Sequence, residues 1–427
     1  IASFAERKAE IARQLAAAAT RVGGGCQPIE DDALLDEVTA LVERPNVLVC
    51  EFETQFLDVP QECLILTMKA NQKYFPLLDA ESRVDGLGKV VYHNKLGSQG
   101  ERMARVRAIA SAIGQQLGGD ALAAAADTAA RLAKTDLVTD MVGEFPELQG
   151  IMGGYYARHD GLGEDIAFAI EDHYKPRFAG DALPRNAAGV VVALADKLET
   201  LVGMFGIGNL PTGDKDPFAL RRHALGVIRM LIEKDLPLDL GALVAGAVPA
   251  FGDKITNASA ALTDFIFDRL AGALREQGFS AQEVDAVLAL RPQRLGEVSR
   301  LLAAVRAFAA LPESPALAAA NKRIGNILKK AGEVDAHVNP RLLKEPAEAD
   351  LFAALQRFVP EANAQFDAGD YTASLQTLAV LRGPVDAFFD DVMVNAEEMD
   401  LRLNRQGLLK SLHAAMNRVA DLSRLAA

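Results

Sequence analysis

The hydrophobic residues of this 427-residue chain recur at helical spacing over most of its length. In residues 101–118 the apolar positions follow one another at intervals of three or four: Met103, Val106, Ile109, Ile113 and Leu117. Further helical stretches are expected over 121–141, 155–170 and 189–205. The alternation that is typical of strands does not persist anywhere between residues 90 and 311. The pattern predicts a mainly α fold.

The first part of the chain mixes helix and strand. Residues 1–19 and 31–43 each predict a helix, and three consecutive glycines separate them. The run NVLVCEF (46–52) has strand-forming residues, and residues 59–79 predict a short helix followed by a strand. The pattern stops abruptly between residues 82 and 87. This region is therefore expected to be an α+β remnant.

After Pro312–Pro315 (PESP), which indicates a linker, a third group of helices follows. They are expected over residues 316–330, 347–366, 370–381, 384–394 and 398–425. The chain is thus predicted to have three parts, with residues 1–83 as the α+β remnant, 84–312 as a helical middle domain and 313–427 as a helical bundle.

Charge and cysteine content narrow the range of partners. The formal net charge is −13, so RNA binding requires local basic patches and a shape-matched partner. The cysteines Cys26, Cys50 and Cys63 have neither zinc-site spacing nor the even number of a disulfide framework, which indicates reduced thiols. No run of 18 apolar residues occurs, so we expect a soluble, cytoplasmic protein without a membrane partner.

A well-specified turn lies within GVVVALADKLETLVGMFGIGNLPTGDKDPFALRRHALGVIR (189–229). Asp216 stands where an N-cap belongs and Pro217 where the first helical residue belongs. A helix is expected to begin there and to expose Arg221 and Arg222. Composition alone favours a well-capped core helix with a solvated basic face.

The middle domain contains candidate metal ligands on successive predicted segments: Asp136, Asp140, His159, Asp160 and Asp196. Residues 195–198 (ADKL) look like the last ligand-bearing helix of the HD phosphohydrolases, which bind divalent metal through histidines and aspartates. The segment where their His-Asp pair is expected reads AKTD (133–136). A charged lysine offers no lone pair and repels a cation. We therefore predict a degenerate HD site without metal.

Cations cluster on two predicted helices near the end of the chain. Lys410 and Arg418 project away from an apolar face, whereas Arg405 lies near its middle and needs a buried partner. The candidate partners are four carboxylates: Glu397, Glu398, Asp386 and Asp390. The other helix holds four cations, beginning with Lys322 and Arg323. That cluster is either a phosphate-contacting strip or a solvated face.

Several longer blocks resemble the beta subunit of the bacterial two-subunit glycyl-tRNA synthetase. They include KTDLVTDMVGEFPELQGIMGGYYARHDG (134–161), GDKDPFALRRHALGVIRM (213–230), AANKRIGNIL (319–328) and LRLNRQGLL (401–409). The resemblance spans almost the whole chain. It implies an α2β2 assembly in which the alpha subunit carries glycine, ATP, Mg and catalysis. This chain is then expected to recognise tRNA(Gly), with no catalytic residue, metal or cofactor of its own.

The resemblance also assigns the three parts. It implies a region similar to the beta chain of phenylalanyl-tRNA synthetase, an HD-like helical domain, and a DALR-type anticodon-binding bundle with Asp400–Arg402 near the motif. The expected tRNA contacts are Arg402, Lys410, Arg418, Lys322, Arg323, Arg221 and Arg222. The family carries a large N-terminal portion, and several dozen residues around positions 82–84, that are missing from this sequence.

Two other functions stay open from the residues alone. A metal-dependent phosphohydrolase would bind metal near His159 and Asp196. A helical adaptor for a protein partner would bind RNA with little dependence on salt.

Overall fold

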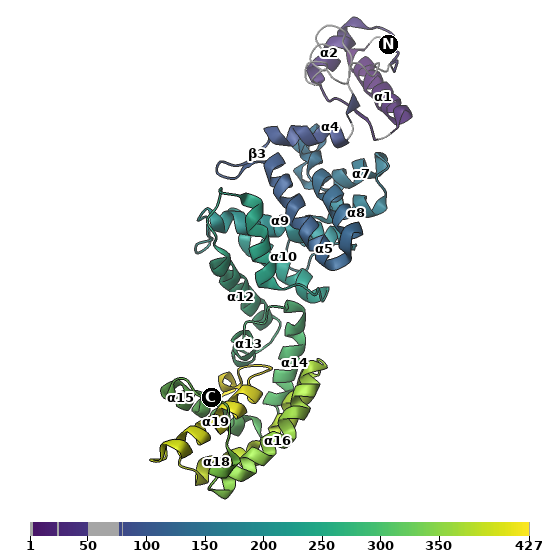
Figure 1. Cartoon of the computed structure of the whole chain (residues 1–427). Helices are drawn as coiled ribbons and strands as arrows, with labels where there is room; N and C mark the ends of the chain where they lie inside the picture. The colour runs from purple at the N-terminus through teal and green to yellow at the C-terminus, as the bar shows by residue number, and fades with distance from the viewer. Residues whose placement is uncertain (1–2, 24, 50–76, 79, 427) are drawn as a thin grey trace. The chain divides into compact units, whose positions relative to one another are not determined.

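The computed structural model describes residues 3–23, 25–49, 77–78 and 80–426, and these are mainly α-helical, as predicted (Figure 1). The chain divides into two units. The first comprises residues 1–227 and 243–262, and the second comprises 228–242 and 263–427. The domain boundaries near residues 83 and 312 stay predictions.

The first two predicted helices are confirmed, and the structure shows which residues cap them. Helix α1 spans Phe4–Val22, and the Ser3 side chain accepts a hydrogen bond from the Glu6 amide. Helix α2 spans Asp32–Leu41, and Asp31 caps it by accepting from the Leu34 amide at 2.9 Å. Each cap satisfies an amide that has no partner inside its helix.

The predicted strand at 46–52 is only partly described, and residues 46–49 form no strand. The Val47 amide instead donates to the Gln14 side chain of α1, at 2.8 Å, so a helix takes the place of a sheet partner. A two-residue strand β1 (Gln27–Pro28) pairs antiparallel with β2 (Leu77–Leu78), close to where the second strand is expected to end. Cys50, Cys63 and the helix predicted before β2 lie outside the described residues.

The segment leading into the helical body is compact. A short helix α4 (Ala80–Val84) and a 3-10 turn (Asp85–Lys89) precede a hairpin of β3 (Val91–His93) and β4 (Gly97–Ser98). These strands are too short for an alternating pattern to reveal them. Ser98 and Glu101 then form a capping box that starts the next helix.

Helix α5 (Gln99–Leu132) breaks at Gly118 and Gly119, where φ reaches 66° at Gly119. The break separates the two helices predicted over 101–118 and 121–141, although the second ends at Leu132. Short elements follow: a 3-10 turn (Thr135–Val138), α6 (Asp140–Glu144), a 3-10 turn (Pro146–Leu148), α7 (Ile151–His159) and α8 (Glu164–Asp172).

Helix α9 (Ala187–Gly206) is the centre of the first unit. Every residue from 188 to 206 is buried, and the helix packs against α5 and α8 (Figure 1). A Cβ placed on Gly203 would lie 2.8 Å from the Phe251 ring, so only glycine allows this close approach. Because α9 is buried all round, its charged residues must be paired inside the protein.

Helix α10 (Leu220–Glu233) begins three residues after Pro217, later than predicted. Asp216 still caps it, because its carboxylate accepts from the Leu220 amide at 2.8 Å and from the Arg221 amide at 3.0 Å. Between Asp216 and the start of the helix the chain turns through Ala219, where φ is 54°. Then follow α11 (Leu240–Ala247), a 3-10 turn (Val248–Phe251) and α12 (Ser259–Glu276).

The described residues of the second unit form helices joined by turns and loops, without a strand. Its elements are α13 (Ala281–Leu288), a 3-10 turn (Leu295–Glu297), α14 (Val298–Ala309), α15 (Ser314–Ala331), a 3-10 turn (Pro340–Leu342), α16 (Pro346–Asp367), α17 (Tyr371–Ala379), α18 (Arg382–Asp391), α19 (Met399–Met416) and a final 3-10 turn (Leu422–Leu425). Helix α16 packs against α17 and α18, and α15 packs against α19 and the final turn.

The last helix ends nine residues before its predicted end at residue 425. Asn417 stops it, because its amide group donates to the His413 carbonyl and its oxygen accepts from the Leu422 amide. Within the described ranges, no single helix is both long enough and apolar enough to cross a membrane.

Candidate nucleic-acid interface

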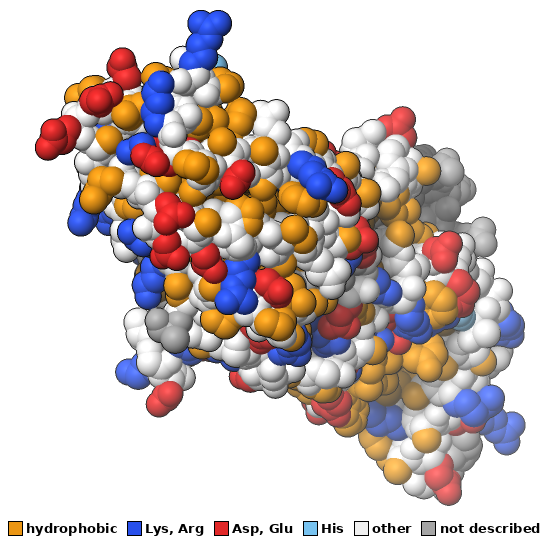
Figure 2. Space-filling model, turned by 90° about the horizontal axis from the view of Figure 1, so that it is seen from below, with side chains coloured by type: hydrophobic (Ala, Val, Ile, Leu, Met, Phe, Trp, Pro, Cys, Tyr) orange, Lys and Arg blue, Asp and Glu red, His pale blue; other side chains and the backbone are white. Residues whose placement is uncertain are grey.

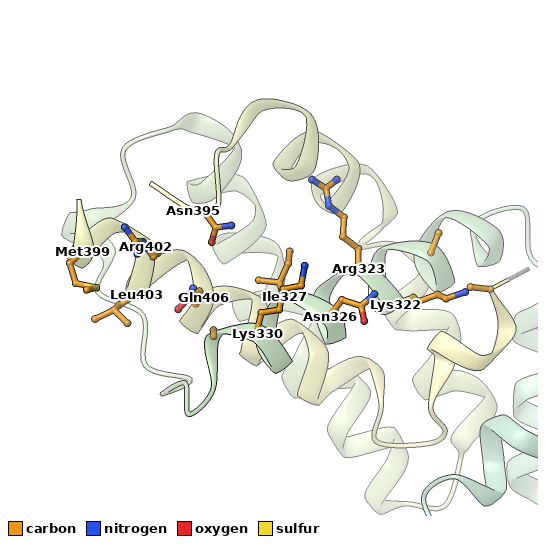
Figure 3. A pocket seen from close by; sticks show the side chains of 13 residues that line it. Lys322, Arg323, Asn326, Ile327, Lys330, Asn395, Met399, Arg402, Leu403 and Gln406 are labelled. Carbon is orange, nitrogen blue, oxygen red and sulfur yellow. The ribbon is translucent and has the colours of Figure 1, made fainter. Parts of the chain in front are cut away.

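A groove of about 830 Å³ runs between α15 and α19 in the second unit (Figure 3). Side chains of both helices, of the segment before α19 and of the chain end line it: Ala319, Lys322, Arg323, Asn326, Ile327, Lys330, Ala331, Asn395, Met399, Arg402, Leu403, Gln406 and Ala426. Three of the seven predicted tRNA contacts, Lys322, Arg323 and Arg402, therefore share one groove.

The helical period of α15 explains why its polar residues line one wall. Lys322, Asn326 and Lys330 are four residues apart and lie on one face. The opposite face is buried and includes Ile324 and Leu328. Burial of such apolar side chains contributes roughly 1.5–3 kcal/mol each and holds the polar face outward.

An amide pair joins the two helices near the end of α19. Asn321 is buried, and its amide nitrogen donates to the Asn417 oxygen at 2.8 Å. Asn417 returns the bond at 2.9 Å. Two reciprocal hydrogen bonds, from the buried Asn321 and the partly buried Asn417, set the register of the α15 wall against α19.

The wall formed by α19 has the spacing of one helical face, because Arg402, Leu403 and Gln406 lie three, four and seven positions after Met399. Arg405 points into the core instead, as predicted.

The prediction of its partners was wrong, because Arg405 pairs with none of the four expected carboxylates: Glu397, Glu398, Asp386 and Asp390. The Nε of Arg405 donates to Glu348 of α16 at 2.6 Å, and both side chains are buried. The four expected carboxylates lie close in sequence, but the core face of α19 packs against α16, which supplies the counter-charge.

The groove is cationic although the protein is acidic. Its lining includes Lys322, Arg323, Lys330 and Arg402, and no carboxylate occurs among the described residues that line it. On the face shown in Figure 2, by contrast, acidic and basic side chains are interspersed among apolar ones. The Arg323 guanidinium lies over the Phe389 ring at 4.2 Å, which orients it. A concave surface of one sign concentrates potential and attracts a polyanion.

The structure places the other predicted contacts outside this groove. Arg418 is exposed, but Asp367 and Asn363 of α16 hold it, at 2.6 and 3.0 Å. Lys410 is exposed on another face of α19.

Arg221 and Arg222 belong to the first unit. Arg221 donates to the Gly213 carbonyl at 2.6 Å, and Arg222 is exposed. Contact of these two residues with RNA stays a prediction.

Sequence reasoning missed the uncharged half of the groove: Asn395, Met399, Leu403 and Gln406. The spacing of three and four residues from 399 to 406 was the available signal. This signal was hard to see because most leucines of the same helix, such as Leu408 and Leu412, follow a second apolar face that is buried in the core.

The first unit contains a buried network of charges that includes Asp196, one of the residues predicted for a degenerate metal site. Lys134, two residues after α5, lies 3.3 Å from Asp196 of α9 and 2.9 Å from Nε2 of His173. Arg102 of α5 lies 3.0 Å from the same Asp196 carboxylate. Burial opposes the charge of Asp196, but these cations hold its pKa well below the usual range.

His173 presents a lone pair to the lysine. Its Nδ1 lies 2.5 Å from the Ile170 carbonyl, so this nitrogen carries the proton and Nε2 accepts from the Lys134 ammonium. Burial and the charge of Lys134 lower the pKa of His173 to about 3, which keeps the ring neutral. Burial lowers the pKa of Lys134 to about 8. The lysine is therefore mainly charged at neutral pH.

The other members of the predicted site lie elsewhere. Asp136 accepts from the amides of Gly150 and Gly153, at 2.6 and 3.1 Å, and so serves the start of α7. His159 is the exposed last residue of α7, and Asp160 lies 3.9 Å from Arg83. The histidine of the network, His173, was not predicted, because it follows α8 and precedes no aspartate. Among the described residues, no group of three or more His, Cys, Asp or Glu side chains is placed to hold a metal ion.

Comparison with known proteins agrees with this picture. A family model of the glycyl-tRNA synthetase beta subunit matches residues 1–83 and 78–289, and a model of the DALR anticodon binding domain matches residues 317–422. The matched bundle contains both walls of the groove. The two family models thus define the class of protein, the tRNA-recognition component of an aminoacyl-tRNA synthetase.

Curated relatives specify which one. The glycine–tRNA ligase beta subunit of Paracidovorax citrulli is 73% identical over 475 residues, covering 100% of this chain and 67% of the relative. Those of Acidovorax ebreus and a Janthinobacterium species are 71% and 63% identical, each with 100% of this chain and 68% of the relative covered. The chain belongs to the family of glycyl-tRNA synthetase beta subunits, which confirms the resemblance seen in the sequence.

Proposed function

We propose that this chain binds tRNA(Gly) in the groove between α15 and α19 and holds it for aminoacylation by an alpha subunit within an α2β2 assembly. The observation that carries the proposal is a groove with four cations and no carboxylate among its described lining residues, on a chain of net charge −13. Its place in the anticodon-binding domain supports the same assignment.

The contribution of the chain to the reaction is positional. Lys322, Arg323 and Lys330 contact backbone phosphates, which fixes the orientation of the tRNA without a reacting group on this chain. The acceptor end then reaches the active site of the alpha subunit, which holds glycine and ATP. Holding both reactants in place removes the entropic cost of bringing them together.

The triple variant Lys322→Gln, Arg323→Gln and Lys330→Gln tests the proposal. With purified alpha subunit, we expect the KM for tRNA(Gly) to rise on the order of tenfold or more, with little change in the KM for glycine or ATP. The slope of log Kd against log salt should fall by about 2, because each phosphate contact with single-stranded RNA contributes about 0.7. Steady-state aminoacylation and tRNA binding at several salt concentrations measure both.

A matched control removes three positive charges elsewhere in the same domain, with Lys329→Gln, Arg341→Gln and Lys344→Gln. All three side chains are exposed and none lines the groove. We expect a much smaller rise in KM. Equal effects of the two triple variants would show that net charge, and not the groove, binds the tRNA.

We further propose that the network around Asp196 is an HD-type metal site in which the Lys134 ammonium replaces the metal ion. Metal-binding histidines commonly donate one ring N–H to a backbone carbonyl and offer the other nitrogen to the cation. His173 does so toward Lys134. The residues present do not fit a metal, because the ammonium occupies the place between His173 and Asp196 and Arg102 adds a second positive charge.

Substitution of Lys134 by alanine tests this role. Removing one partner from a buried charge network costs about 3–5 kcal/mol, so the first unit should unfold at lower urea concentration. The exposed Lys95→Ala provides the control, with an expected change within about 0.5 kcal/mol. Wild-type protein should contain far less than one divalent metal per chain by elemental analysis. One metal ion per chain, lost on His173→Ala, would contradict the proposal.

A further inference from the structure

The two walls of the groove differ in chemistry (Figure 3). The α15 wall presents the exposed cations Lys322 and Lys330. The α19 wall presents Met399 and Leu403, which are 59% and 51% exposed, and Asn395 precedes that helix. A single RNA strand has the same two-sided character, with charged phosphates along one side and flat bases with polar edges on the other.

The segment that carries Asn395 is held by two arginines of α19. Arg402 donates from Nε to the Ala396 carbonyl at 2.9 Å and from Nη2 to the Glu397 carbonyl at 3.3 Å. Arg405 donates from Nη1 to the Met393 carbonyl at 2.8 Å. The backbone is therefore bound on both sides of Asn395, whose own side chain is exposed at the groove.

Arg402 thus uses its hydrogen-bonding groups on the protein itself. Two of its guanidinium nitrogens donate to backbone carbonyls. An arginine committed in this way fixes geometry and contributes less to a phosphate contact than the exposed Lys322 and Lys330. The sequence suggested that Arg402 contacts tRNA, whereas these hydrogen bonds favour a role in positioning the backbone near Asn395.

We infer that the α15 cations bind the phosphates of the tRNA strand and that Asn395 reads the edge of a base lying against Met399 and Leu403. Arg402 is a positioning residue for Asn395. A carboxamide carries both a donor and an acceptor, so it distinguishes bases by their hydrogen-bonding edges. A groove of about 830 Å³ has room for individual nucleotides. This inference rests on the proposed function of the groove.

The experiment separates the two walls by two independent readouts. Binding of the full chain to a tRNA(Gly) transcript, and to transcripts with single changes in the anticodon loop, is measured by fluorescence anisotropy at several salt concentrations. Lys322→Gln with Lys330→Gln should weaken all transcripts by the same factor and lower the salt slope by about 1.4. Asn395→Ala should leave the slope unchanged and reduce the preference for the unchanged loop about tenfold.

Arg402→Ala should behave like Asn395→Ala, with reduced discrimination at an unchanged salt slope. The control is Gln376→Ala, which removes an exposed carboxamide of α17 outside the groove and should change neither readout. A merely destabilising effect of Arg402→Ala would weaken every transcript alike, so the preference among loops reports positioning specifically. Circular dichroism confirms that each variant is folded.

The outcomes separate this inference from the proposed function. If the wild-type chain binds no transcript, both are overturned. If it binds but the lysine variants and Asn395→Ala change slope and discrimination in the same way, only the division of the walls is overturned. A lower salt slope for Arg402→Ala would make Arg402 a phosphate contact and remove its positioning role.

Discussion

Glu199→Ala should lower the free energy of unfolding of the first unit by about 3–5 kcal/mol, the range for breaking a buried ion pair. Glu199 is 0% exposed. It accepts from Arg102 at 2.9 Å and from Arg105 at 2.8 Å, and so joins α9 to α5. Its removal leaves two buried guanidinium groups side by side with Asp196 as the counter-charge. Urea unfolding followed by circular dichroism, together with hydrogen exchange of the α5 and α9 amides, measures the loss.

An exposed ion pair of the same unit is the control. Asp127 pairs with Arg107 at 2.9 Å, but both side chains are more than a third exposed. Asp127→Ala should therefore cost less than about 1 kcal/mol, because solvent screens the pair. Comparable losses in the free energy of unfolding for Asp127→Ala and Glu199→Ala would show that burial does not make the Glu199 network more important for stability than an exposed ion pair.

Glu348→Ala should destabilise the second unit by a similar amount, about 3–5 kcal/mol. Glu348 is the buried partner of Arg405 and also accepts from the amides of Lys344 and Glu345, at 2.8 and 2.7 Å, at the start of α16. The substitution therefore removes a counter-charge and a helix cap together. Chemical unfolding, with hydrogen exchange of the α16 and α19 amides, locates the effect.

A second substitution tests whether the unpaired charge of Arg405 causes most of the stability lost in Glu348→Ala. In Glu348→Ala with Arg405→Met the orphaned guanidinium is gone, so the double variant should be more stable than Glu348→Ala alone. Arg382, which pairs with Asp386 on the surface of α18, gives the comparison, and Asp386→Ala should have a small effect. A double variant that is less stable than either single variant would assign the loss to packing.

The helices could be predicted because their signals are local. Ser3, Asp31 and Ser98 precede the helices that they cap, and the hydrophobic period identifies each buried face. Boundaries failed where a contact from elsewhere intervened. Asn417 ends α19 early through its bonds with His413 and Leu422, and its side chain is held in place by Asn321, which is 96 positions away in sequence. The local sequence contains no sign of the contact with Asn321.

The candidate sites divide in the same way. The cluster that begins with Lys322 and Arg323 could be identified from the sequence because its residues lie close together in one segment. The lysine that replaces an expected metal ligand could be identified because it interrupts a known motif. His173 and Asn395 were not identified, since each acquires a role only through side chains of other helices.

By itself, the sequence determined the family, the order of most helices, the Asp216 cap and the presence of a lysine where a metal ligand is expected. The tertiary structure alone decided that Glu348 neutralises Arg405, that His173 faces Lys134, and that α15 and α19 form one groove. Helical hydrogen bonds and caps join residues within a few positions of each other, so they leave a mark in the local sequence. The convergence of side chains from distant helices depends on how those helices pack, and many different sequences satisfy the same packing.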